Sequence, residues 1–361
     1  MEKSMIKRIL ILTFIVSFTL IGCASKEGEN YTKKETTIEG GALSEDNKKS
    51  DKNKKERKIS VWTTYWDTVD LENEFDKISG NIKDISYFAV YFDENEKLFI
   101  PDEIEATNEM IKKRYPKYNY GSYLTFVNDL LRKDEASSLK DKDLLYRLFS
   151  TEESMNNHVK EILSMTIKGG YSGVEIDYEA IGKDVILWNS FLKFVEKLYT
   201  EAIKKDIDVR IVLEPNFPEE SITFPKGPEY VIMCYNLHGY GTTPGPKANK
   251  EFILKMIEKM KKLPGNINFA MSTGGFKFYG DKVEQLSEKE AVELAKMYDA
   301  TIIRDEDSKA RYFTYVDDES VSYEVWYADH ETLDFWFSIV EESGDYGLSL
   351  WRMGGNLSIL Q

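Results

Sequence analysis

The sequence predicts an α/β fold, a (β/α)8 barrel of the TIM type, in a chain of 361 residues. From residue 59 onward, strand-like runs alternate with helical patterns, and 42% hydrophobic residues allow a sizeable core. The eight candidate strands are residues 59–66, 85–92, 120–127, 173–179, 208–215, 230–236, 267–275 and 346–351. A doubly wound open sheet is the alternative that this alternation leaves open.

The helices between these strands are predicted by apolar residues that recur at helical spacing. The candidates are residues 153–168, 187–205, 252–262 and 330–342. The span between the seventh and eighth strands is too long for a simple crossover, and it holds two alternating strand-like runs. We therefore expect a small α+β insertion at about residues 281–329, within a barrel domain that covers residues 59–361.

The N-terminus has the pattern of an exported, lipid-anchored protein. Basic residues precede an apolar run, residues 9–21, which is too short for a membrane span and predicts a signal peptide over residues 1–22. The run ends in Leu-Ile-Gly-Cys, which resembles a bacterial lipobox with Cys23 as the lipid attachment site; a plain signal peptide with an incidental cysteine is the alternative. Residues 23–58 predict a flexible tether. The lipid alone would then hold the protein on the extracytoplasmic side of the cell membrane.

Composition disfavours some classes of function. A net charge of -15 argues against a nucleic-acid partner. The three histidines are scattered without the spacing of a metal site, so neither a metal nor another cofactor is expected. If Cys23 carries lipid, Cys234 has no partner for an internal disulfide. We expect the protein to act as a monomer.

Three acids alternate with apolar residues in the stretch GYSGVEIDYEAI, which spans residues 170–181. Because alternate side chains of a strand share a face, Glu175, Asp177 and Glu179 are expected to point the same way. On an edge strand that face would simply be exposed to solvent. In a barrel the acids would point inward, near the C-terminal strand end where barrel enzymes place catalytic groups. The alternation alone leaves both interpretations open.

The same stretch resembles the DGxDxDxE signature of glycoside hydrolase family 18, the chitinase-like family that includes N-acetylglucosaminidases. The resemblance puts Glu179 at the catalytic acid and Asp177 at the aspartate that orients the substrate's acetamido group. Glu175 stands where a supporting aspartate is usual, and Ser172 replaces the first aspartate. Together with the N-terminus, this implies a bacterial lipoprotein form of the family.

Two further segments resemble the family's motifs in the same order. VIMCYNLHG is similar to the sixth-strand motif, with Met233 and Tyr235 matching and Asn236 in place of an aspartate. GLSLWRMGG is similar to the eighth-strand motif, whose Trp351 would form the floor under the sugar. Without this register, Tyr235 and Trp351 would be assigned to the core.

The resemblance implies a retaining, substrate-assisted hydrolysis of β-linked N-acetylglucosamine glycans. Glu179 would protonate the glycosidic oxygen, and the substrate's acetamide carbonyl would attack the anomeric carbon. Asp177 would hold the acetamide N–H, and Tyr235 would hydrogen-bond the acetamide oxygen.

Further residues are expected around this centre. The supporting residues are Glu175, Met233 and Asn236. Tyr65 and Trp66 end the first strand and are expected to line the sugar cleft. Glu214 and Asn128 follow or end other strands, and the sequence assigns them no role.

The glycan itself stays open among peptidoglycan, chitin oligomers and N-glycans; we expect a peptidoglycan or chitin-type polymer at the cell surface. A lectin-like lipoprotein on the same barrel is the main alternative, because Ser172, Glu175 and Asn236 depart from the family's motifs. An envelope or sporulation lipoprotein with a vestigial site is a third hypothesis.

Overall fold

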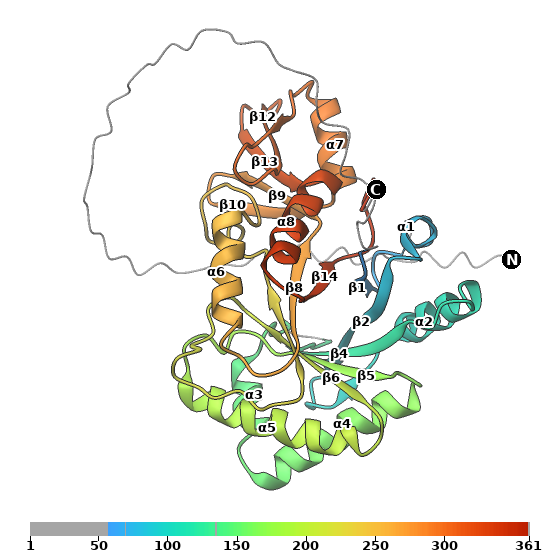
Figure 1. Ribbon diagram of the computed structural model, residues 1–361. Helices are drawn as coiled ribbons and strands as arrows, with labels where there is room; N and C mark the ends of the chain where they lie inside the picture. The colour runs from blue at the N-terminus through green and yellow to red at the C-terminus, as the bar shows by residue number, and fades with distance from the viewer. Residues whose placement is uncertain (1–56, 69, 134–135, 360–361) are drawn as a thin grey trace, which may run out of the picture. The chain divides into compact units, whose positions relative to one another are not determined.

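Eight parallel strands close into a barrel in the computed structural model, which describes residues 57–68, 70–133 and 136–359 (Figure 1). The barrel strands are β1 (Ile59–Thr64), β2 (Ile82–Phe92), β4 (Gly121–Leu130), β5 (Gly173–Asp177), β6 (Asp208–Leu213), β7 (Glu229–Met233), β8 (Ile267–Ser272) and β14 (Gly347–Trp351). β1 pairs with both β2 and β14, so the sheet closes on itself. The predicted barrel is confirmed, and each predicted strand is present near its expected position. A short strand, β3 (Leu98–Phe99), pairs antiparallel with β2.

Helices follow most of the barrel strands and surround them (Figure 1). They are α1 (Leu71–Ile78), α2 (Asp102–Arg114), α3 (Lys142–Leu148), α4 (Glu152–Lys168), α5 (Val185–Ile203), α6 (Lys250–Met260) and α8 (His330–Ser343). Val174 and Ile176 of β5 are fully buried and share one hydrophobic cluster with Phe191 and Val195 of α5. Because side chains alternate along a strand, the acids between these apolar residues face the barrel interior.

The insertion between β8 and α8 forms a five-stranded antiparallel sheet that packs against a helix. Its elements are β9 (Gly274–Tyr279), β10 (Lys282–Leu286), α7 (Glu288–Met297), β11 (Ile303–Arg304), β12 (Arg311–Val316) and β13 (Ser322–Ala328). The sheet begins at Gly274, where the chain turns out of the barrel with a φ of +59°. At Gly275 a Cβ would lie 1.7 Å from the carbonyl oxygen of Trp326, so only glycine allows this approach to β13. Residues 267–275, which the sequence predicts as one strand, are therefore two.

The predicted signal peptide, Cys23 and nearly all of the tether lie outside the described residues. Within residues 57–359, leaving aside the three undescribed positions, no helix combines the length and apolar character needed to cross a bilayer. In the same part of the chain, Cys234 is buried without a disulfide partner. No group of three histidine, cysteine or acidic side chains there could hold a metal ion.

Candidate active site

Glu175 lies on β5 inside the barrel, and its side chain is 0% exposed. Its carboxylate accepts hydrogen bonds from Trp62 of β1 (2.5 Å), Ser86 of β2 (3.0 Å) and Thr125 of β4 (2.8 Å). Both carboxylate oxygens are thus hydrogen-bonded, as a buried charge requires. The carboxylate ties β5 to three other strands across the interior.

The charge of Glu175 faces a buried cation, Arg210 of β6. The guanidinium Nη1 lies 3.5 Å from Glu175 Oε2, and the Arg210 side chain is 1% exposed. Its Nη2 donates to Ser349 of β14 (3.0 Å), and its Nε lies 2.8 Å from a carboxylate oxygen of Glu229 on β7. Sequence reasoning missed this residue, whose signal is a single cation among the apolar residues of the run DVRIVLEP.

Asp177 is the last residue of β5 and lies on the same face of the strand as Glu175. It is 7% exposed, and within the described part of the chain its Oδ1 has no hydrogen-bond partner. Burial raises the pKa of Asp177 well above its ordinary value, and the charges of Glu179 and Glu175 raise it further. A buried oxygen without a partner is costly, so this atom is suited to accept a hydrogen bond from a ligand.

Glu179 lies beyond the end of β5. The strand ends at Asp177, two residues before the predicted end, because the backbone of Glu179 bonds to side-chain groups and not to the backbone of a neighbouring strand. Asn128 of β4 holds its backbone: the Glu179 N–H donates to Asn128 Oδ1 (2.9 Å), and Asn128 Nδ2 donates to the Glu179 carbonyl (3.1 Å). The next N–H, that of Ala180, donates to Glu214 (2.9 Å). These contacts give Asn128 and Glu214, which the sequence left unassigned, positioning roles around Glu179.

The half-buried side chain of Glu179 forms an ion pair with Lys140, which lies in the loop between β4 and α3. The Lys140 backbone N–H donates to Asp129 (2.7 Å). Burial lowers the pKa of Lys140, but the charges of Glu179 and other nearby acids outweigh it, and the net shift is upward. The ammonium therefore stays charged at neutral pH. A lysine in a polar loop gives no sequence signal, and sequence reasoning missed this contact.

Aromatic residues from several strands gather beside the acids. Tyr235, after β7, and Trp351, at the end of β14, pack against a buried cluster that includes Trp62 and Met233. The Trp351 ring contacts Phe88 edge to face, with 4.8 Å between ring centroids. Burial raises the pKa of Tyr235 well above its ordinary value, and the nearby acids raise it further. Its phenol therefore stays protonated and can donate a hydrogen bond.

The remaining predicted residues lie at the edge of this site or outside it. Tyr65 and Trp66 follow β1 with ring centroids 5.0 Å apart, and Trp66 is 51% exposed. Asn236 is exposed, and its amide donates to the sulfur of Met233 (3.6 Å) rather than to an acid. Ser172 precedes β5 at the amino end of the strand, where it bonds across to β4. Its replacement of an aspartate therefore lies away from the mouth of the barrel.

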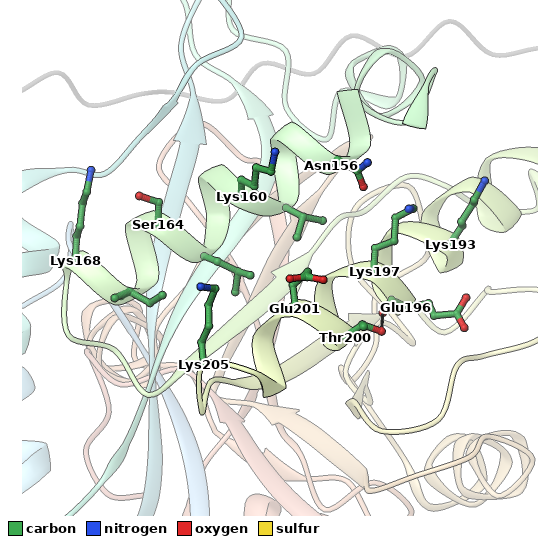
Figure 2. Close-up of a pocket in the computed structure, with 13 residues that line it drawn as sticks. Asn156, Lys160, Ser164, Lys168, Lys193, Glu196, Lys197, Thr200, Glu201 and Lys205 are labelled. Carbon is green, nitrogen blue, oxygen red and sulfur yellow. Dashed lines mark hydrogen bonds between the residues drawn. The ribbon is translucent and has the colours of Figure 1, made fainter. Parts of the chain in front are cut away.

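A separate groove of about 1000 Å³ lies on the outside of the barrel between α4 and α5 (Figure 2). The lysines that line it are Lys160, Lys168, Lys193, Lys197 and Lys205. Two of them, Lys193 and Lys197, pair with Glu152 at the start of α4. The lining contains none of the predicted site residues, so this groove is not part of the acidic site.

No family model matches the chain. Its sequence is similar to that of the cortical fragment-lytic enzyme of Bacillus cereus, with 33% identity over 223 residues that cover 55% of this chain and 50% of that protein. The chain spans 50% to 66% of the lengths of the curated relatives that it matches.

Solved structures share the barrel fold. The spore cortex-lytic enzyme SleL of Bacillus cereus superposes with a TM-score of 0.68 at 19% identity, over 83% of this chain and 72% of that one. A chitinase of Chromobacterium violaceum superposes with a TM-score of 0.69 at 15% identity, over 82% and 95% of the two chains. At these identities the likeness shows a common fold.

Proposed function

We propose that this protein is a glycoside hydrolase that cleaves β-linked N-acetylglucosamine glycans with retention, using the substrate's acetamido group as the nucleophile. The observation that carries the proposal is the buried Oδ1 of Asp177, near Glu179 at the barrel mouth, which has no hydrogen-bond partner among the described residues. An acceptor without a protein partner suits an N–H donor from the substrate, and an acetamide supplies one. The relatives named as a cortical fragment-lytic enzyme and a chitinase support the same class of reaction.

In the proposed reaction Glu179 donates its proton to the glycosidic oxygen as the bond from that oxygen to the anomeric carbon breaks. The acetamide carbonyl oxygen attacks the anomeric carbon from the other side and forms an oxazolinium-type intermediate. Asp177 accepts the acetamide N–H and stabilises the positive charge that develops there. Water then attacks the anomeric carbon, Glu179 takes its proton, and the product keeps the original configuration.

Other residues position the sugar without reacting. The protonated phenol of Tyr235 donates to the acetamide oxygen, and the half-buried ring of Trp351 forms an apolar floor. Glu175 has no part in proton transfer, because both of its oxygens are already hydrogen-bonded inside the barrel. It fixes the strand that presents Asp177.

The test is digestion of chitin oligomers and of purified peptidoglycan by the purified full-length protein. Mass spectrometry should identify products with new reducing ends at N-acetylglucosamine. Proton NMR should show these ends appearing first as the β-anomer, because the reaction retains configuration. Release of another reducing sugar, or initial formation of the α-anomer, contradicts the proposal.

The proposed location is the extracytoplasmic side of the cell membrane, with lipid on Cys23 and the barrel on a tether. The support is the basic lead, the short apolar run and its lipobox-like end. Labelled fatty acid should mark the wild-type protein in cells but not Cys23→Ser; equal labelling of both would contradict this location.

A glycan-binding lectin on the same barrel is a second candidate. The ion pair between Lys140 and Glu179 favours it, because the pair occupies the carboxylate that hydrolysis needs. Tight oligosaccharide binding without any product after long incubation would support the lectin over the hydrolase.

A further inference from the structure

Lys140 forms an ion pair with Glu179, the carboxyl group on which the proposed reaction depends. Its ammonium pairs with Oε2 of Glu179 and so occupies an oxygen of the carboxyl group that has to reach the glycosidic oxygen. A proton donor, however, must hold its proton when the glycosidic oxygen reaches it. The pair therefore opposes the first step in the substrate-free protein, and substrate binding has to separate it.

The surroundings of this ion pair are strongly acidic. Asp177 ends β5 and Glu179 lies two residues further along the chain, and the charge of Glu214 also acts on Lys140. Asp129 accepts from the Lys140 backbone. The guanidinium that faces the innermost acid is almost fully buried and cannot serve a ligand. Lys140 is therefore a partly exposed cation that these acids hold at the mouth of the barrel.

Lys140 combines a fixed backbone with a side chain that is free to change partner. Its backbone N–H is bonded to Asp129, its φ is +53°, and α3 begins two residues later. The Lys140 side chain is 50% exposed, against 16% for Glu179. An exposed ion pair of this kind contributes at most about 1 kcal/mol, so a carboxylate on a bound ligand can compete for the ammonium.

We propose that Lys140 is a specificity residue, which binds a carboxylate on the sugar of the leaving-group side and thereby releases Glu179. The inference rests on the proposed function. The ammonium keeps its three protons and exchanges one carboxylate for another. Glu179 takes up one proton from solvent and gives it to the glycosidic oxygen. The attacking water returns one proton to Glu179, and that proton goes back to solvent when the ion pair forms again.

The proposed exchange separates two classes of glycan. A chitin oligomer is neutral and has no group that competes for the ammonium. A glycan in which N-acetylglucosamine is followed by a sugar with a lactyl carboxylate, such as N-acetylmuramic acid, supplies that group. Lys140 therefore selects substrates of the peptidoglycan type.

The experiment compares kcat/KM for a chitin oligomer with kcat/KM for an oligosaccharide of alternating N-acetylglucosamine and N-acetylmuramic acid. Lys140→Gln should lower the value for the acidic glycan by about ten- to a hundredfold, the equivalent of one charged hydrogen bond. It should raise the value for the neutral glycan, because the ion pair that opposes the first step is removed. Lys142→Gln is the matched control, because Lys142 is 40% exposed and pairs with Asp184 instead. It should leave both values unchanged.

A change in the substrate isolates the contact. Converting the lactyl carboxylate to its methyl ester should lower kcat/KM of the wild-type protein by the same factor as Lys140→Gln does. It should leave kcat/KM of the Lys140→Gln variant unchanged. Parallel losses on both glycans in Lys140→Gln would overturn the inference, as would wild-type cleavage without preference for the acidic glycan; both outcomes leave the proposed function intact. Failure of the wild-type protein to cleave either glycan overturns the proposed function, and this inference with it.

Discussion

Glu175 and Glu179 belong to one short run of sequence and each pairs with a cation, but their surroundings are opposite. In the pair of Glu175 with Arg210 the side chains are 0% and 1% exposed, and three further donors bond to the carboxylate. In the pair of Glu179 with Lys140 they are 16% and 50% exposed. The inner pair is closed to exchange, whereas the outer pair lies where a ligand can replace one partner.

The difference shows that a row of acids is not by itself an active site. An inner acid with every oxygen bonded can only hold the barrel together, since losing its partner would leave a buried charge. The intermediate acid, Asp177, is buried, but one of its oxygens has no hydrogen-bond partner in the part of the chain that the structure describes. Chemistry is therefore expected where hydrogen bonding is incomplete or exchangeable, which is the outer half of the row.

The largest expected effect on folding comes from breaking the inner pair. Arg210→Met leaves the Glu175 charge buried without its cation, and the free energy of unfolding should fall by about 3–5 kcal/mol. Urea unfolding measures this change. Lys140→Gln breaks the outer pair as a control and should cost less than about 1 kcal/mol. Equal losses in the two variants would remove the distinction between the pairs.

A smaller effect of mixed sign is expected for Asp177→Asn. Hydrolysis should slow by about a hundredfold, because the amide cannot balance the positive charge of the intermediate. The free energy of unfolding, in contrast, should be higher for the variant than for the wild-type protein at neutral pH. The folded protein raises the pKa of Asp177, so the stabilisation from this group is full below about pH 4 and is lost as the pH rises through the raised value.

The variant therefore should gain stability over the wild-type protein between pH 4 and pH 7. Urea unfolding at both pH values measures the gap. If the variant instead lost stability relative to the wild-type protein as the pH rises from 4 to 7, Asp177 would be stabilised as a carboxylate, contrary to its buried position.

Local sequence patterns predicted the barrel, and for a strand within a barrel they predicted that the acids point inward. Val174 and Ile176 alternate with Glu175 and Asp177. In a closed parallel sheet one set must face the surrounding helices and the other the barrel interior. The motif resemblance placed Glu179 next in the row, and the structure puts it at the carboxyl end of β5.

The partners of these acids could not be predicted, because they come from distant segments. Trp62 lies 113 residues from Glu175 along the chain, and Lys140 lies 39 residues from Glu179. No spacing rule connects such positions, and only closure of the barrel brings them together. The start of the insertion was missed for a similar reason: the close approach of Gly275 to β13 is visible only once the strands are paired.

The central claim is that Glu179 supplies the proton for glycan cleavage. The most direct test is kcat/KM of Glu179→Gln on an N-acetylglucosamine glycan, measured on protein whose folding is verified by urea unfolding. We expect a loss of about 10²- to 10⁴-fold, the usual contribution of a general acid, with stability changed by less than about 1 kcal/mol. Full activity in the folded variant would show that the proton comes from another group and would contradict the account.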